Sequence, residues 1–138
     1  MGRVDVRIKV SNWFDVEKLA VGETDSAPRS AEVEAMVDAG AVRLYPKASV
    51  IRDLGLRHID DISSRTMANV TVQRRVFTPV DLEINGRSGR FGVVAVSGGL
   101  LNIVGQIPLE ELDWGGDCQG HKLIPNPEHK HGELCDDF

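Results

Sequence analysis

The sequence is poor in cysteine and in long apolar segments. Its 138 residues include only two cysteines, Cys118 and Cys135, which are too few for a disulfide scaffold and favour a reducing compartment, so we expect a cytoplasmic protein. The longest β-rich apolar run, residues 93–96, is far too short to span a membrane, and the charged start of the chain is unlike a signal peptide. We therefore expect no membrane partner.

Charge of one sign is not concentrated anywhere in the chain. Sixteen Lys and Arg stand against 21 Asp and Glu, a formal net charge of −5, and the densest basic pair is Arg74-Arg75. An acidic balance without a basic run argues against a nucleic-acid partner. The apolar fraction of 41% and the charged fraction of 27% are near globular averages, and at this length they predict a single packed domain.

Alternating apolar residues predict two strands in the first third of the chain. Over residues 4–10, valine and isoleucine alternate with charged side chains, which is the period of a half-buried strand. Residues 31–37 alternate in the same way and lead into Asp38. Between these strands, residues 22–30 are rich in Gly, Ser, Thr and Pro, and they follow an irregular segment that begins at Asn12. This composition predicts a surface connection.

Alternating valines predict more strands in the middle of the chain. One strand is expected over 70–76 and another over 80–84, and Asn85-Gly86 predicts a hairpin turn to a partner over 91–96. Such a series of short strands indicates a mostly β fold.

Helical signals are few. Pro46, followed by apolar residues at helical spacing up to Gly55, predicts one short helix, and residues 108–112 predict a helical turn. The last twenty residues are polar, and we expect them on the surface with a loose end. The expected fold therefore has one or two short helices.

Asp38 is the strongest candidate for chemistry. It ends an apolar strand and is followed by Ala39 and Gly40. Glycine permits a sharp turn in which backbone N–H groups reach the carboxylate. Asp-x-Gly also occurs at Asp53 and Asp113, and by itself it is equally typical of a turn aspartate that hydrogen-bonds its own backbone.

Two further features distinguish the segment around Asp38. Its flank, residues 35–41, is apolar, and a later apolar-apolar-glycine unit, Ile103-Val104-Gly105, is suited to pack beneath the loop. Residues 36–41, 46–56, 103–110 and 117–127 thus form a set of separated motifs in a fixed order. Together they resemble the bacterial retropepsin-like (clan AA) aspartic proteases.

The resemblance covers about residues 3–128 and implies a fold and an activity. It implies a small closed β-barrel, like half of a pepsin, over residues 1–128, with a polar tail over 129–138. It also implies a homodimer that hydrolyses peptide bonds of polypeptides without a metal or other cofactor, with Asp38 as the catalytic residue of each chain. The chemistry agrees, because aspartic proteolysis needs two carboxylates that share one proton, and each chain offers one. A two-fold axis would pair them.

The resemblance also assigns supporting residues. Gly40 shapes the catalytic loop together with Ala39, and Ile103, Val104 and Gly105 support it. The flap that closes over the substrate is formed by Thr66, Met67, Ala68, Asn69 and Val70. A glycine-containing turn is usual in that flap, and Asn69 can adopt a similar backbone.

Ala39 departs from the Asp-Thr-Gly or Asp-Ser-Gly of the family. The missing hydroxyl removes a hydrogen bond across the two-fold axis, which costs about 1–3 kcal/mol, or about one to two powers of ten in rate. Since water is the nucleophile and both acids remain, we expect an active but weakened protease. The alternative is a catalytically inactive module of the same fold that binds peptides or dimerises.

The tail contains residue types that zinc prefers: Cys118, His121, His129, His131 and Cys135. Their spacing matches no established zinc motif. A solvated tail that binds no metal is the expected state, and a metal-binding module built on the tail is a third possible class.

Overall fold

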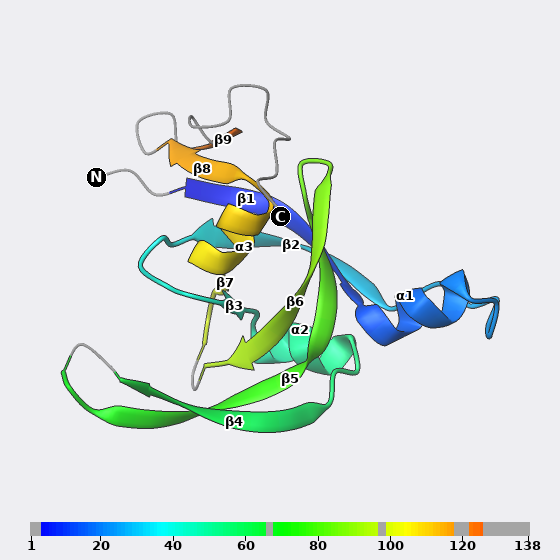
Figure 1. The fold of residues 1–138 in the computed structure, drawn as a ribbon, viewed down its shortest axis with the longest axis horizontal. Helices are drawn as coiled ribbons and strands as arrows, with labels where there is room; N and C mark the ends of the chain where they lie inside the picture. The colour runs from blue at the N-terminus through cyan, green and yellow to red at the C-terminus, as the bar shows by residue number, and fades with distance from the viewer. Residues whose placement is uncertain (1–3, 66–67, 97–98, 118–121, 126–138) are drawn as a thin grey trace, which may run out of the picture.

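The computed structural model describes residues 4–65, 68–96, 99–117 and 122–125, which form a β-barrel with short helices around it (Figure 1). The elements in chain order are β1 (Val4–Asn12), α1 (Trp13–Ala20), β2 (Ser30–Val37), β3 (Leu44–Tyr45), α2 (Ala48–Asp53), β4 (His58–Arg65), β5 (Thr71–Ile84), β6 (Arg87–Ala95), β7 (Asn102–Val104), α3 (Gln106–Glu111), β8 (Trp114–Asp117) and β9 (Lys122–Pro125). None of the helices in these ranges is long and apolar enough to cross a membrane.

Six strands close the barrel. They are hydrogen-bonded in the order β1-β2-β7-β3-β6-β5, and β5 pairs in turn with β1, so the sheet returns to its first strand. β4 lies outside this ring, on the free edge of β5. The expectation of a small closed, mostly β barrel is confirmed.

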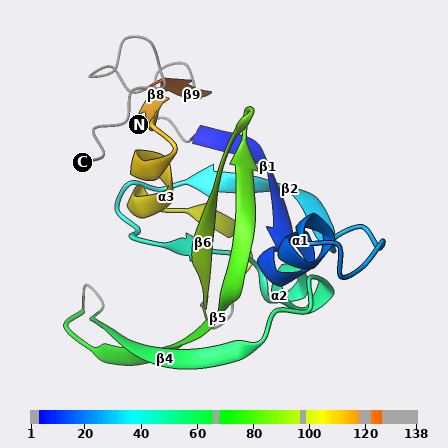
Figure 2. The same ribbon diagram turned by 45° about the vertical axis from the view of Figure 1, so that its right-hand side comes forward.

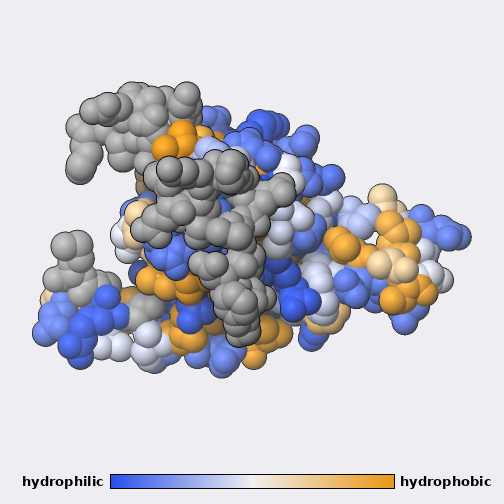
Figure 3. Space-filling view, turned by 45° about the horizontal axis from the view of Figure 1, so that its top comes forward, coloured by the Kyte–Doolittle hydropathy of each residue, from blue (hydrophilic) through white to orange (hydrophobic). Residues whose placement is uncertain are grey.

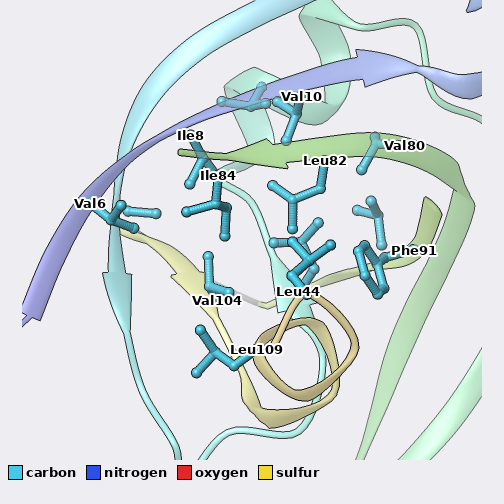
Figure 4. Close-up of a cluster of buried hydrophobic side chains, with 14 of the residues drawn as sticks. Val6, Ile8, Val10, Leu44, Val80, Leu82, Ile84, Phe91, Val104 and Leu109 are labelled. Atoms are coloured by element: carbon cyan, nitrogen blue, oxygen red, sulfur yellow. The ribbon is translucent and has the colours of Figure 1, made fainter. Parts of the chain in front are cut away.

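The barrel interior is filled by the alternate residues of its strands. β1 has the burial pattern that its sequence predicts, with Val4, Val6, Ile8 and Val10 buried and the charged residues between them exposed. Val80, Leu82 and Ile84 of β5 face the same core, which Leu44 and Val104 help to fill (Figure 4). Burial of these branched side chains supplies the main driving force for closing the barrel.

The hairpin turn is confirmed, but the two strands expected before it are one. Asn85 and Gly86 have φ angles of 48° and 85°, as a tight turn between β5 and β6 requires. β5 is continuous over residues 71–84, and a register shift between Phe77 and Val80 bends it. Before the bend β5 pairs with β4, and after it with β1. A bulge thus lets one strand belong both to the barrel and to a projecting hairpin.

The sequence prediction also misses α1 and β4, which both lie outside the barrel. α1 follows β1 directly, where no regular structure is expected, and none of its residues is buried. It projects from the barrel, and Figure 3 shows hydrophobic residues gathered on this projection. β4 forms a long hairpin with β5 that extends beyond the barrel on another side (Figures 1 and 2).

The expectation of a loose C-terminal end is wrong for residues 122–125. β8 and β9 pair as a two-stranded antiparallel sheet, and Leu123 is buried in the core. The indole N–H of Trp114 donates to the carbonyl of Ile84 at 3.2 Å, and the Arg87 guanidinium lies 4.0 Å from the Trp114 ring centroid. These contacts attach the small sheet to the barrel, and residues 126–138 lie outside the described ranges.

Candidate active site

Asp38 follows the last residue of β2, at the point where the chain leaves the barrel. Its backbone N–H donates to the Val104 carbonyl at 3.0 Å, so β7 fixes the end of the strand. The Oδ1 atom of Asp38 accepts the Gly40 N–H at 2.9 Å, and the Asp38 carbonyl accepts the Ala41 N–H at 3.1 Å. This is the sharp turn that the sequence predicts, and it orients one carboxylate oxygen.

The loop after Asp38 is supported from below by the segment that follows β7. Gly105 donates to the Arg43 carbonyl at 2.8 Å, Gln106 to the Ala41 carbonyl at 2.8 Å, and Ile107 to the Val42 carbonyl at 2.9 Å. A Cβ at Gly105 would lie 2.4 Å from the Arg43 carbonyl oxygen. The predicted packing of residues 103–105 beneath the loop is therefore present, and only glycine permits so close an approach.

An open cavity of about 500 Å³ lies in front of Asp38. The residues around it come from the Asp38 loop, from β3, from both strands of the projecting hairpin, from the end of β6 and from β7: Asp38, Gly40, Ala41, Val42, Tyr45, Arg65, Arg74, Val96 and Ile103. Ligand sites commonly have this size and this mixture of apolar and polar walls. Asp38 is the only carboxylate among the described residues that line it.

Three of the expected flap residues, Ala68, Asn69 and Val70, lie at the tip of the β4–β5 hairpin. Ala68, Asn69 and Val70 are exposed, and Asn69 has a φ of 61°, the left-handed conformation for which asparagine is suited. Thr66 and Met67 lie outside the described residues. Ala68, Asn69 and Val70 do not line the cavity; the described hairpin side chains that do are Arg65 and Arg74.

Ala39 is exposed in the single chain, next to the half-buried Asp38. Its exposure leaves the side chain open to solvent in the single chain. The absence of a hydroxyl at this place in the loop is therefore not compensated by apolar packing.

Tyr45, Arg65 and Arg74 are the cavity residues that the sequence does not reveal as part of a site. Arg74 belongs to the densest basic pair of the chain, which is the only signal that marks it. The sequence has no way to show that β4 and β5 extend beyond the barrel and bring Arg65 and Arg74 to the cavity of Asp38.

The candidate zinc ligands of the tail, Cys118, His121, His129, His131 and Cys135, all lie outside the described residues. Within the described ranges, no group of three or more His, Cys, Asp or Glu is placed to hold a metal ion.

The chain matches no protein-family model, and no curated protein is similar enough to it to count as a match. The function of the site is therefore argued from its geometry.

Proposed function

We propose that the protein is a homodimeric aspartic endopeptidase with Asp38 of each chain as its catalytic pair. The observation that carries the proposal is the position of Asp38: a carboxylate at the end of a barrel strand, held by Gly40 and by the segment after Val104, facing an open cavity. The low cysteine content supports a reducing compartment such as the cytoplasm.

The chemistry needs no group beyond the two carboxylates and water. In the proposed dimer one Asp38 is ionised and takes a proton from water, while the protonated Asp38 of the other chain donates its proton to the scissile carbonyl oxygen. The water oxygen bonds to the scissile carbonyl carbon as these protons move, which gives a tetrahedral diol. The diol collapses when the Asp38 that took the water proton passes it to the amide nitrogen and the C–N bond breaks, while the other Asp38 takes back a proton from a diol hydroxyl as the carboxyl group forms. The Gly40 N–H, 2.9 Å from Oδ1, helps to hold the carboxylate in place during these transfers.

A second chain is required because the cavity of one chain contains one carboxylate among its described residues. Exposed apolar residues support an interface on the same side of the molecule. Val42 and Ile107, joined by a backbone hydrogen bond, are 52% and 46% exposed, and Leu100, in the segment between the cavity residues Val96 and Ile103, is 82% exposed. Large apolar side chains exposed together favour a protein contact.

The projecting hairpin suits the role of a flap. It extends beyond the barrel, it contributes walls to the cavity of Asp38, and its tip at Ala68 to Val70 is exposed. A hairpin anchored in the barrel at the β5 bulge has the geometry to close over an extended peptide, whose backbone groups pair readily with strands.

A peptide-binding or dimerising module without activity is the second candidate, and Ala39 favours it. A statine-type transition-state mimic separates the two, because a working pair of carboxylates binds it at acidic pH far more tightly than it binds a substrate peptide, whereas an inactive module does not discriminate.

The decisive test is incubation of the protein with a diverse peptide library between about pH 3.5 and 7, since a coupled carboxyl pair must hold one proton. Asp38→Asn is tested beside the wild type, with Asp53→Asn as a control from the Asp-x-Gly at the end of α2. We expect cleavage by the wild type and by Asp53→Asn and none by Asp38→Asn. Equal cleavage by all three proteins would exclude Asp38 as the catalytic residue.

A further inference from the structure

The two faces of the β4–β5 hairpin differ in exposure. The register pairs Ile62 with Arg74 and Arg65 with Thr71, so alternate residues of both strands share a face. Ile62, Val72 and Arg74 are half-buried and define the inner face. The odd-numbered residues on the other face are exposed, and Figure 3 shows the outer part of the hairpin as mostly hydrophilic.

Arg74 is the one charged residue among the half-buried positions of β5 between Val72 and Val76, and it lines the cavity of Asp38. Arg65, at the end of β4, also borders this cavity, but it is exposed and pairs with Thr71 of the other face. Neither guanidinium forms an ion pair with any described residue, Asp38 included. The neighbouring Arg75 points the other way, with its guanidinium 5.3 Å from the Phe77 ring centroid.

We propose that Arg74 forms a specificity subsite for an acidic side chain of the substrate, close to the scissile bond. The inference rests on the proposed peptidase function and names its substrate class: polypeptides with Asp or Glu near the cleaved bond. Arg74 is a specificity residue, because it acts on a part of the substrate that does not react.

The chemistry of the cavity selects a carboxylate. A guanidinium presents a planar fork of donors that matches two carboxylate oxygens, and a half-buried cation without a partner gains most from an anionic ligand. Arg74 would repel a lysine or arginine of the substrate, and a neutral side chain would leave the guanidinium without an anionic partner. Tyr45, Val96 and Ile103 supply the remaining walls, which suit the aliphatic part of a glutamate.

The test compares two peptide libraries that are identical except for Glu or Gln at one fixed position. At about pH 6 the glutamate is ionised. We expect wild-type cleavage within two residues of the fixed position to be about tenfold more efficient in kcat/KM for Glu, equivalent to about 1.4 kcal/mol. Arg74→Gln should reduce this ratio to about twofold or less, while the matched control Arg75→Gln keeps it. A ratio near one for the wild type, or an equal loss in both variants, would overturn the subsite but leave the peptidase standing.

A binding measurement separates failure of the subsite from failure of the peptidase. If the wild type cleaves neither library, the peptidase proposal fails, and calorimetry with the blocked hexapeptides Ala-Ala-Glu-Phe-Ala-Ala and Ala-Ala-Gln-Phe-Ala-Ala decides the subsite. Tighter binding of the Glu peptide to the wild type and to Arg75→Gln, but not to Arg74→Gln, supports it. Equal affinities for the two peptides, or no binding of either, would refute it.

Discussion

Replacing Gly105 by alanine is expected to destabilise the protein and to disorganise the Asp38 loop. Gly105 is extended, with φ −91° and ψ −169°, so its backbone conformation is open to alanine. The conflict is steric: the new Cβ would lie 2.4 Å from the Arg43 carbonyl oxygen and 2.8 Å from both the Arg43 nitrogen and the Ala41 carbonyl oxygen. Because all three are backbone atoms, the two segments must separate.

The loss of stability can be calculated from the contacts that are disturbed when the Gly105 segment moves away from residues 41–43. Overpacking costs about 1–3 kcal/mol, and each weakened hydrogen bond between the two segments adds about 0.5–1.5 kcal/mol. We expect a loss of about 3 kcal/mol in the free energy of unfolding. For a chain of this length that loss lowers the melting temperature by about 10 °C.

Gly92 provides the matched control. It lies in β6, it is exposed, and a Cβ there meets nothing within 4 Å. Thermal unfolding followed by circular dichroism should show Gly92→Ala within about 2 °C of the wild type, since an open strand position tolerates alanine well. Peptidase activity measured well below the melting temperature should fall for Gly105→Ala alone. Equal melting temperatures for the two variants would refute the steric argument.

Four other outcomes are expected. Ala39→Thr should raise cleavage about tenfold by restoring a hydroxyl donor, which a kinetic comparison with wild type tests; an unchanged rate in a normal dimer would contradict it. Light scattering after size exclusion should give twice the chain mass at tens of micromolar, and a monomer mass would count against the catalytic pair. Truncation after Glu128 should leave the melting temperature within a few degrees, whereas a large drop that zinc reverses would support the metal module. Arg29 hydrogen-bonds Asp15 at 2.7 Å and holds the pKa of that carboxyl below its ordinary 3.8, so the pair stabilises the fold above that pH and the stabilisation is lost as the pH falls through the lower, folded-state pKa. Asp15→Asn should therefore cost about 0.5–1 kcal/mol at pH 7, after allowance for solvent screening of the half-exposed Arg29, and progressively less in urea titrations at acidic pH; a cost that does not fall with pH would refute the pairing.

The hydrophobic pattern of the sequence predicted a strand correctly where buried and exposed residues alternate regularly along it. β1 is the clearest case, because its valines and isoleucine face the core while its charged residues face solvent. The turn at Asn85-Gly86 was also predictable, since few other dipeptides adopt two positive φ angles in succession.

The sequence pattern did not predict elements whose structure depends on residues far away in the chain. β4 is mostly polar because both its faces lie outside the barrel, so it carries no apolar alternation. α1 has no buried face, yet a signal for it was present: the Asn12 side chain accepts the Asp15 N–H at 3.2 Å, which is the bond of a helix N-cap. Leu123 looked like part of a polar tail because its partners lie in the barrel and not beside it in the chain.

The sequence by itself determined the mostly β architecture and the turn that holds Asp38, because alternation, glycine and the Asp-x-Gly geometry act over a few residues. Only the tertiary structure decided what surrounds Asp38. The β5 bulge directs one end of a strand out of the barrel, and the hairpin it forms carries Arg74 to the cavity while Arg75 faces away. In the sequence nothing distinguishes Arg74 from Arg75. Because side chains alternate along a strand, the two arginines lie on opposite faces of β5, and the pairing register determines which face meets the cavity of Asp38.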